Sequence, residues 1–130
     1  MAEKQLTGKP TESELEILQV LWEHGPSTVR FVNDELNRSR ETGYTTTLKI
    51  LQIMHEKGMV HRDDSARTHI YRAAIGETAT QKQLLDRFLD TAFRGSALKL
   101  VMQALGNRKT SAQELNEIRD LLDKLKENEK

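Results

Sequence analysis

The sequence contains no cysteine among its 130 residues. A chain without thiols has no disulfide, no thiolate zinc site and no cysteine nucleophile. Histidine is also scarce, with four copies, and a hairpin would bring His61 and His69 face to face. Two ligands are too few for a zinc site. We therefore expect no metal and no other cofactor.

Long apolar segments are absent as well. No stretch approaches the run of about 20 apolar residues that a membrane helix needs. Residues 1–10 are polar and lack the apolar centre of a signal peptide, so they are predicted to form a flexible arm. We expect a cytoplasmic protein without membrane insertion.

Neither sign of charge is in excess, because 20 basic residues balance 20 acidic ones. The overall basic character that is typical of nucleic-acid-binding proteins is therefore missing. Locally, residues 38–72 carry seven basic and four acidic side chains, a net charge of +3. Such a patch favours salt-sensitive DNA binding with few phosphate contacts per subunit. A solvated surface of mixed charge is the alternative.

The signatures of an enzyme are also missing. The sequence has no glycine-rich phosphate loop, and its serines have no histidine and carboxylate partners at a recognisable spacing. We expect no catalytic residues and no enzymatic activity.

What is present is a run of three short helical patterns. Thr11 and Glu14 form a capping-box pattern before the first helix, and Ser27 is predicted to cap the second. Trp22 and Phe31 lie within apolar stripes and are assigned to the core. The third helix should begin at residue 44 or 45 and end at residue 57, just before a glycine.

Residues 59–62 and 68–72 read as two short strands joined by a turn-rich tip. Three helices followed by a hairpin make a winged helix-turn-helix, the hairpin being the wing. In this motif the last helix lies in the major groove, with its N-terminal residues at the base edges. The predicted fold is mainly α with a small β-hairpin wing.

This geometry selects candidate DNA-binding residues at the start of the third helix and on the wing. Their hydroxyl groups, methyl groups and cations suit base edges and phosphates. They are Tyr44, Thr45, Thr46, Lys49, Arg62 and Arg67. Three alternatives stay open: the two threonines cap the helix, Tyr44 packs on the core, and Lys49 is merely solvated.

Three further helical patterns fill the C-terminal tail, residues 76–130. Gly95 should break the first of these helices and Gly106 the second. Ser96 and Ser111 are predicted to cap the two helices that follow. The three patterns carry more large apolar side chains than three short helices can hide, which indicates an interface. The predicted dimer-interface residues are Leu85, Phe88, Leu98, Val101, Met102, Leu115, Ile118, Leu122 and Leu125. We expect a DNA-binding domain over residues 11–75 and a helical dimerisation domain over residues 76–130.

Several segments, in order, resemble the penicillinase-repressor (BlaI/MecI) family over about residues 7–125. They are Glu14–Gly25, Ser27–Val29, Tyr44–Leu48, Glu56–Val60, Phe93–Ser96 and Ser111–Leu115. The resemblance implies a homodimeric repressor on an inverted-repeat double-stranded DNA operator with TACA/TGTA half-sites. It also implies control of β-lactam resistance or related stress genes, relieved when a membrane sensor protease signals and the penultimate helix is cut.

The sequence departs from the family pattern at three points. β-Lactam-responsive members are cut between Asn and Phe, and the matching candidate cleavage positions here are Gln103 and Ala104. A copper-responsive branch has a cysteine-rich tail, which this chain lacks. Ile53 replaces an arginine of many members, which removes one phosphate contact.

Two other functions compete with this reading. A regulator that responds to a small molecule would need a pocket with polar groups near residues 74–80, the expected hinge. A winged helix that serves only as a protein-interaction module would leave the candidate DNA-binding residues without a role.

Overall fold

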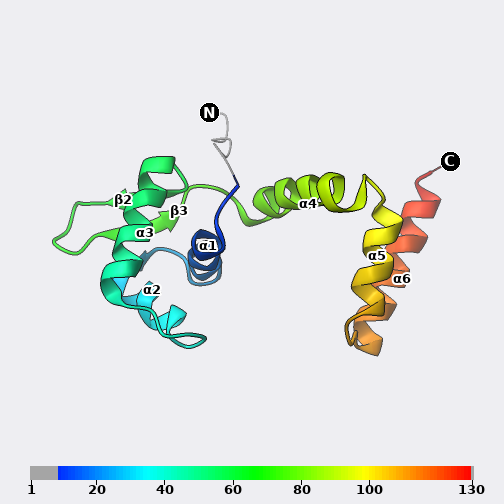
Figure 1. Ribbon diagram of the computed structural model, residues 1–130, viewed down its shortest axis with the longest axis horizontal. Coiled ribbons are helices and arrows are strands. Elements are labelled where there is room, and N and C mark those ends of the chain that lie inside the picture. The colour runs from blue at the N-terminus through cyan, green and yellow to red at the C-terminus, as the bar shows by residue number, and fades with distance from the viewer. Residues whose placement is uncertain (1–8, 130) are drawn as a thin grey trace. The chain divides into compact units, whose positions relative to one another are not determined.

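The computed structural model describes residues 9–129, so most of the arm predicted over residues 1–10 lies outside the described residues. Its elements are α1 (Glu12–His24), β1 (Ser27–Thr28), α2 (Val29–Leu36), α3 (Tyr44–Lys57), β2 (Val60–Asp63), β3 (Ile70–Ala73), α4 (Glu77–Phe93), α5 (Ala97–Gly106) and α6 (Ala112–Glu127) (Figure 1). The chain divides into two compact units between Leu84 and Leu85. The first unit confirms the mainly helical winged fold.

The two predicted boundaries of helices α1 and α3 are confirmed. Thr11 Oγ1 accepts a hydrogen bond from the Glu14 amide at 3.1 Å, and the Thr11 amide donates to Glu14 Oε1 at 3.0 Å. This complete capping box starts α1. Gly58 ends α3 in the left-handed conformation, with φ 82°, which a residue without Cβ adopts at little cost.

The prediction that Ser27 caps the second helix is wrong. Ser27 and Thr28 form the short strand β1, in which Ser27 pairs with Tyr71 of β3. This pairing keeps the backbone extended through Thr28, whose Oγ1 then accepts from the Phe31 amide at 3.1 Å and caps α2. The Ser27 hydroxyl instead donates to the Gly25 carbonyl at 2.8 Å.

The sheet has three antiparallel strands in the order β1-β3-β2, one more than the predicted hairpin. Its register places His61 opposite Arg72. The expectation that His61 faces His69 is therefore wrong, because His69 precedes β3 and its Nε2 lies 3.5 Å from Asp64.

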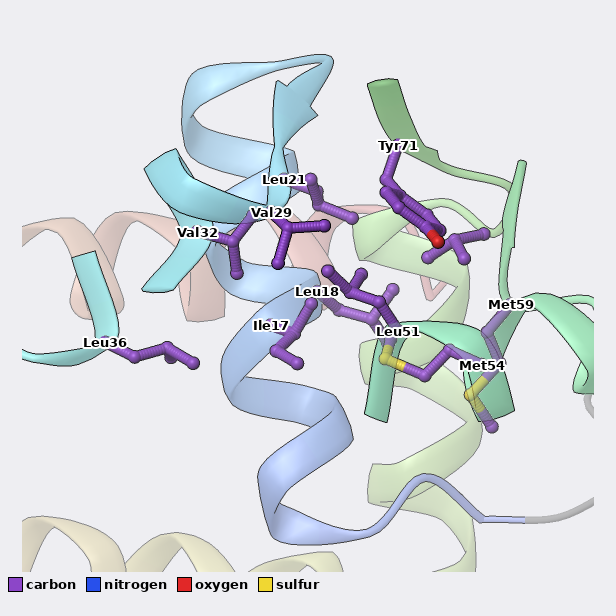
Figure 2. Packing of buried hydrophobic residues seen from close by; sticks show 11 residues of the cluster. Ile17, Leu18, Leu21, Val29, Val32, Leu36, Leu51, Met54, Met59 and Tyr71 are labelled. Carbon is purple, nitrogen blue, oxygen red and sulfur yellow. The ribbon is translucent and has the colours of Figure 1, made fainter. Parts of the chain in front are cut away.

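The core of the first unit lies between α1, α2, α3 and the sheet (Figure 2). Ile17 and Leu18 of α1 meet Leu51 of α3, and Tyr71 of β3 closes the sheet side. The fully buried Tyr71 ring and its aliphatic neighbours make the packed interior that fixes α3.

Of the two aromatic residues assigned to the core, only one belongs there. Trp22 packs against the core and its Nε1 donates to the Ile75 carbonyl at 2.9 Å. Phe31 is 38% exposed and lies edge-on to His24, with ring centroids 5.1 Å apart. The assignment of Phe31 was wrong because α2 turns a different stripe, ending at Leu36, toward the core.

In the second unit, the predicted breaks between helices are confirmed. Arg94 and Gly95 both have positive φ, 52° and 81°, and end α4. Ser96 Oγ then accepts from the Lys99 amide at 3.1 Å and starts α5. Ser111 starts α6 in the same way, accepting from Glu114 at 3.0 Å. No described helix is long and apolar enough to cross a membrane.

Candidate nucleic-acid interface

The first turns of α3 present a row of exposed polar side chains. Tyr44, Thr45, Thr46 and Lys49 are all solvent-exposed. No described side chain caps α3. The alternative that Thr45 and Thr46 act as helix caps is therefore wrong. Tyr44 is 46% exposed and does not join the core. These four groups remain available to an outside partner.

One amide on α2, that of Asn33, ties the start of α3 to α2. With its side-chain oxygen and nitrogen placed to suit their neighbours, Asn33 Nδ2 donates to the carbonyls of Thr42 at 3.1 Å and Gly43 at 3.2 Å. It also lies 2.7 Å from Oγ1 of Thr47, which is fully buried. These hydrogen bonds hold the first turn of α3, which carries the candidate residues, in a defined position beside α2.

The two wing arginines differ in their ion pairing and in their exposure to solvent. Arg62 Nε lies 2.7 Å from Asp64 Oδ1, and only 27% of the Arg62 side chain is exposed. Arg62 is therefore paired with a carboxylate of its own hairpin. Arg67 is exposed at the tip and forms no ion pair with a described residue.

Several of the basic side chains in residues 38–72 are paired with carboxylates, so fewer of them are available to a partner than the sequence count suggests. Arg40 Nη2 lies 2.5 Å from Glu16 Oε1, and Lys57 Nζ lies 2.8 Å from Glu14 Oε2. Arg38 pairs with Glu35 at 3.3 Å. Within this stretch, the cations that pair with no described carboxylate are Lys49, Arg67 and Arg72.

Another cation stands beside the start of α3. The guanidinium of Arg30, on α2, lies 5.8 Å from the centroid of the Tyr44 ring, within the range of a cation–π contact. Together they border a hollow of about 340 Å³ that faces the wing. Its lining residues are Thr28, Val29, Arg30, Tyr44, Thr68 and His69.

The tail exposes its apolar side chains within a single chain. No residue of α5 or α6 is buried. Of the predicted dimer-interface residues, Ile118 is half-buried and the others are exposed. The exposed ones are Leu85, Phe88, Leu98, Val101, Met102, Leu115, Leu122 and Leu125.

The candidate cleavage positions Gln103 and Ala104 are exposed within α5. A hollow of about 660 Å³ opens nearby at the junction of α4 and α5. Its lining residues are Ala92, Phe93, Arg94, Lys99, Met102, Gln103 and Asn107. This hollow does not lie near residues 74–80, where a regulator that responds to a small molecule was expected to have its pocket.

Within residues 9–129, no group of three or more histidine, aspartate or glutamate side chains is placed to hold a metal ion.

Comparison with known proteins decides the family. A sequence model described as penicillinase repressor matches residues 10–124. The chain belongs to the penicillinase repressor family. Penicillinase repressors of Bacillus licheniformis and Staphylococcus aureus are 25% and 21% identical to it, over 92% and 94% of this chain and 94% and 95% of theirs. A mutant form of ZitR from Lactococcus lactis has a similar structure, with a TM-score of 0.46 and 20% identity over all of this chain and 82% of the other.

Membership of the penicillinase repressor family makes this protein a transcriptional repressor rather than an enzyme. Two residues of this repressor escaped the sequence analysis. Arg30 lies outside the basic stretch of residues 38–72, and only the fold brings it close to Tyr44. Leu121, 54% exposed on α6, falls just beside the predicted apolar stripe.

Proposed function

We propose that this repressor binds an inverted-repeat DNA operator as a homodimer, with residues 11–75 on the DNA and residues 76–130 at the dimer interface. The observation that carries the proposal is the exposed start of α3, where Thr45, Thr46 and Lys49 offer two hydroxyls and a cation on one surface. A major groove admits such a helix, and its base edges present matching donors, acceptors and thymine methyl groups.

The remaining contacts would come from phosphates. Arg67 at the wing tip and Tyr44 at the helix start would meet the backbone, and Arg62 would join only after leaving Asp64. Few free cations per subunit mean few phosphate contacts, and a two-fold dimer doubles them. The apolar side chains of the tail support the dimer, because an unpartnered surface of this kind marks an interface.

The test is a salt series of binding to a duplex with a TACA/TGTA inverted repeat, beside a scrambled duplex. We expect binding to the repeat to be about 1000-fold tighter or more, and its affinity to fall steeply with salt. Equal and weak binding to both duplexes would contradict this operator, and selection from random duplexes would then follow.

We further propose that a membrane sensor protease relieves the repression. The target genes would be those of β-lactam resistance or a related stress response, and the repressor would act in the cytoplasm. A cut between Gln103 and Ala104 would remove the second half of the tail, including α6 with its exposed Leu122. A chain that ends at Gln103 should therefore be monomeric and bind the repeat far more weakly than the full chain, because it occupies one half-site at a time. Retention of the dimer by that shortened chain would argue against cleavage as the signal.

A further inference from the structure

The hollow beside α3 has the composition of an anion site. Its lining includes the guanidinium of Arg30, the phenol of Tyr44 and the imidazole of His69, together with the threonine Thr68. These groups come from α2, α3 and the wing, which are the parts of a winged helix that approach DNA. We propose that this hollow, the Arg30 notch, receives a phosphate of the DNA backbone and that Arg30 is its cation.

Arg30 is free to make this contact. It is exposed and has no carboxylate partner among the described residues, whereas Arg38, on the turn after the same helix, pairs with Glu35. The Tyr44 ring, 5.8 Å from the guanidinium, holds the Arg30 side chain over the notch. Holding the side chain in advance lowers the entropy that phosphate binding costs.

No described carboxylate neutralises the notch from its rim. Among the residues that the structure describes, the carboxylate that pairs with a lining residue is Asp64, which lies 3.5 Å from His69 Nε2 but also 2.7 Å from Arg62 Nε. Its charge is thus compensated within the wing. The start of α3, which no described side chain caps, adds backbone amides on the same side.

This inference rests on the proposed function, because it names the group of the DNA that the notch would take. The main test compares Arg30→Gln with the unchanged repressor on both the repeat and the scrambled duplex. We expect binding to weaken by about 10-fold or more on both. The slope of log affinity against log salt should fall by about 1.8, for one lost contact in each subunit of a dimer.

Two control variants separate a phosphate contact from general damage. Arg38→Gln removes an exposed charge that already has a partner and should leave the salt slope unchanged. Arg30→Lys keeps the charge and should keep the slope, although it loses the guanidinium beside the Tyr44 ring. Melting temperatures equal to that of the unchanged protein would show that all three variants fold.

A duplex scan locates the phosphate. Each phosphate of one half-site is replaced in turn by an uncharged methylphosphonate. The unchanged repressor should lose affinity at the contacted position, and Arg30→Gln should lose none there because its contact is already gone. Identical losses for both proteins at every position would overturn the Arg30 notch.

The remaining outcomes are also decisive. If the repeat and the scrambled duplex bind equally, the operator proposal fails, but a smaller salt slope for Arg30→Gln on the scrambled duplex still supports the notch. If inorganic phosphate, at constant ionic strength, inhibits the unchanged protein and Arg30→Gln keeps full DNA affinity, the notch is a site for free phosphate. An absence of binding to either duplex at low salt would overturn both proposals.

Discussion

Lys57, the last residue of α3, lies against Glu14 in the first turn of α1, with 2.8 Å between Nζ and Oε2. The same Glu14 side chain accepts from the Thr11 amide and completes the capping box of α1. Only 4% of the Glu14 side chain is exposed. One carboxylate therefore starts the first helix and holds the end of the helix that we propose to contact DNA.

This ion pair predicts a pH-dependent stability. Burial alone raises the pKa of Glu14, but the Lys57 ammonium and the Thr11 amide outweigh burial and hold that pKa below its ordinary value. A carboxyl with a lowered folded pKa stabilises the protein above its unfolded pKa, and this is lost as the pH falls through the folded pKa. Glu14→Gln should destabilise the protein by about 1–3 kcal/mol at neutral pH. The difference should disappear in acid.

Denaturant unfolding of both proteins at several pH values checks this. Glutamine still serves in a capping box, so the variant isolates the charge. Glu56→Gln is the matched control, because Glu56 is exposed on α3 and pairs with no described cation. A penalty for Glu14→Gln that stays constant down to acid pH would mean that the charge of Glu14 contributes no stability.

Neighbouring threonines on α3 should behave in opposite ways. Thr46 is exposed, and Thr46→Ala should leave stability unchanged while weakening binding to the repeat by about 1–3 kcal/mol. Thr47 is buried beside Asn33, and Thr47→Val keeps the shape but removes the hydroxyl. That loss should cost about 1–3 kcal/mol of stability. Thermal unfolding and a binding titration on each variant distinguish the two roles, and a reversed pattern would mean that the exposed surface was misidentified.

The sequence predicted best what short segments decide by themselves. The capping box at Thr11, the glycine at residue 58 and the cap at Ser111 are local signals, and each was found in its place. The role of Ser27 was missed because it depends on pairing with Tyr71, far along the chain. A two-residue strand has no periodicity of its own to detect.

The same limit applies to the candidate site. The exposed residues of α3 followed from helical spacing, but the charge count could not show that Arg40 and Lys57 are taken up by Glu16 and Glu14. Those carboxylates belong to α1, whose distance from the basic stretch is set only by folding. Arg30 was missed because the fold alone brings it close to Tyr44, which belongs to a different helix.

Lys49 should be the cation on which base recognition depends most. It is exposed one turn after Thr45 and pairs with no described carboxylate. Lys49→Ala should weaken binding to the repeat more than to the scrambled duplex, since a base contact is worth about 1–3 kcal/mol. Arg67→Ala, which removes a wing cation, should weaken both duplexes alike. Equal losses on both duplexes for Lys49→Ala would identify Lys49 as a phosphate contact instead.

Charge on the apolar side of α6 should separate the dimer without unfolding the DNA-binding domain. Leu122 is 53% exposed in the single chain, although large and apolar, and the core of the first unit contains no residue of α6. Leu122→Glu should therefore give monomers in sedimentation analysis, because a buried carboxylate without a partner is strongly unfavourable. Affinity for the repeat should fall, while the melting of the first unit stays unchanged. Asn116→Glu adds the same charge to another side of α6, away from Leu122, and should remain dimeric. If Leu122→Glu also stays dimeric, Leu122 does not face the partner, and the dimer must form through another part of the tail.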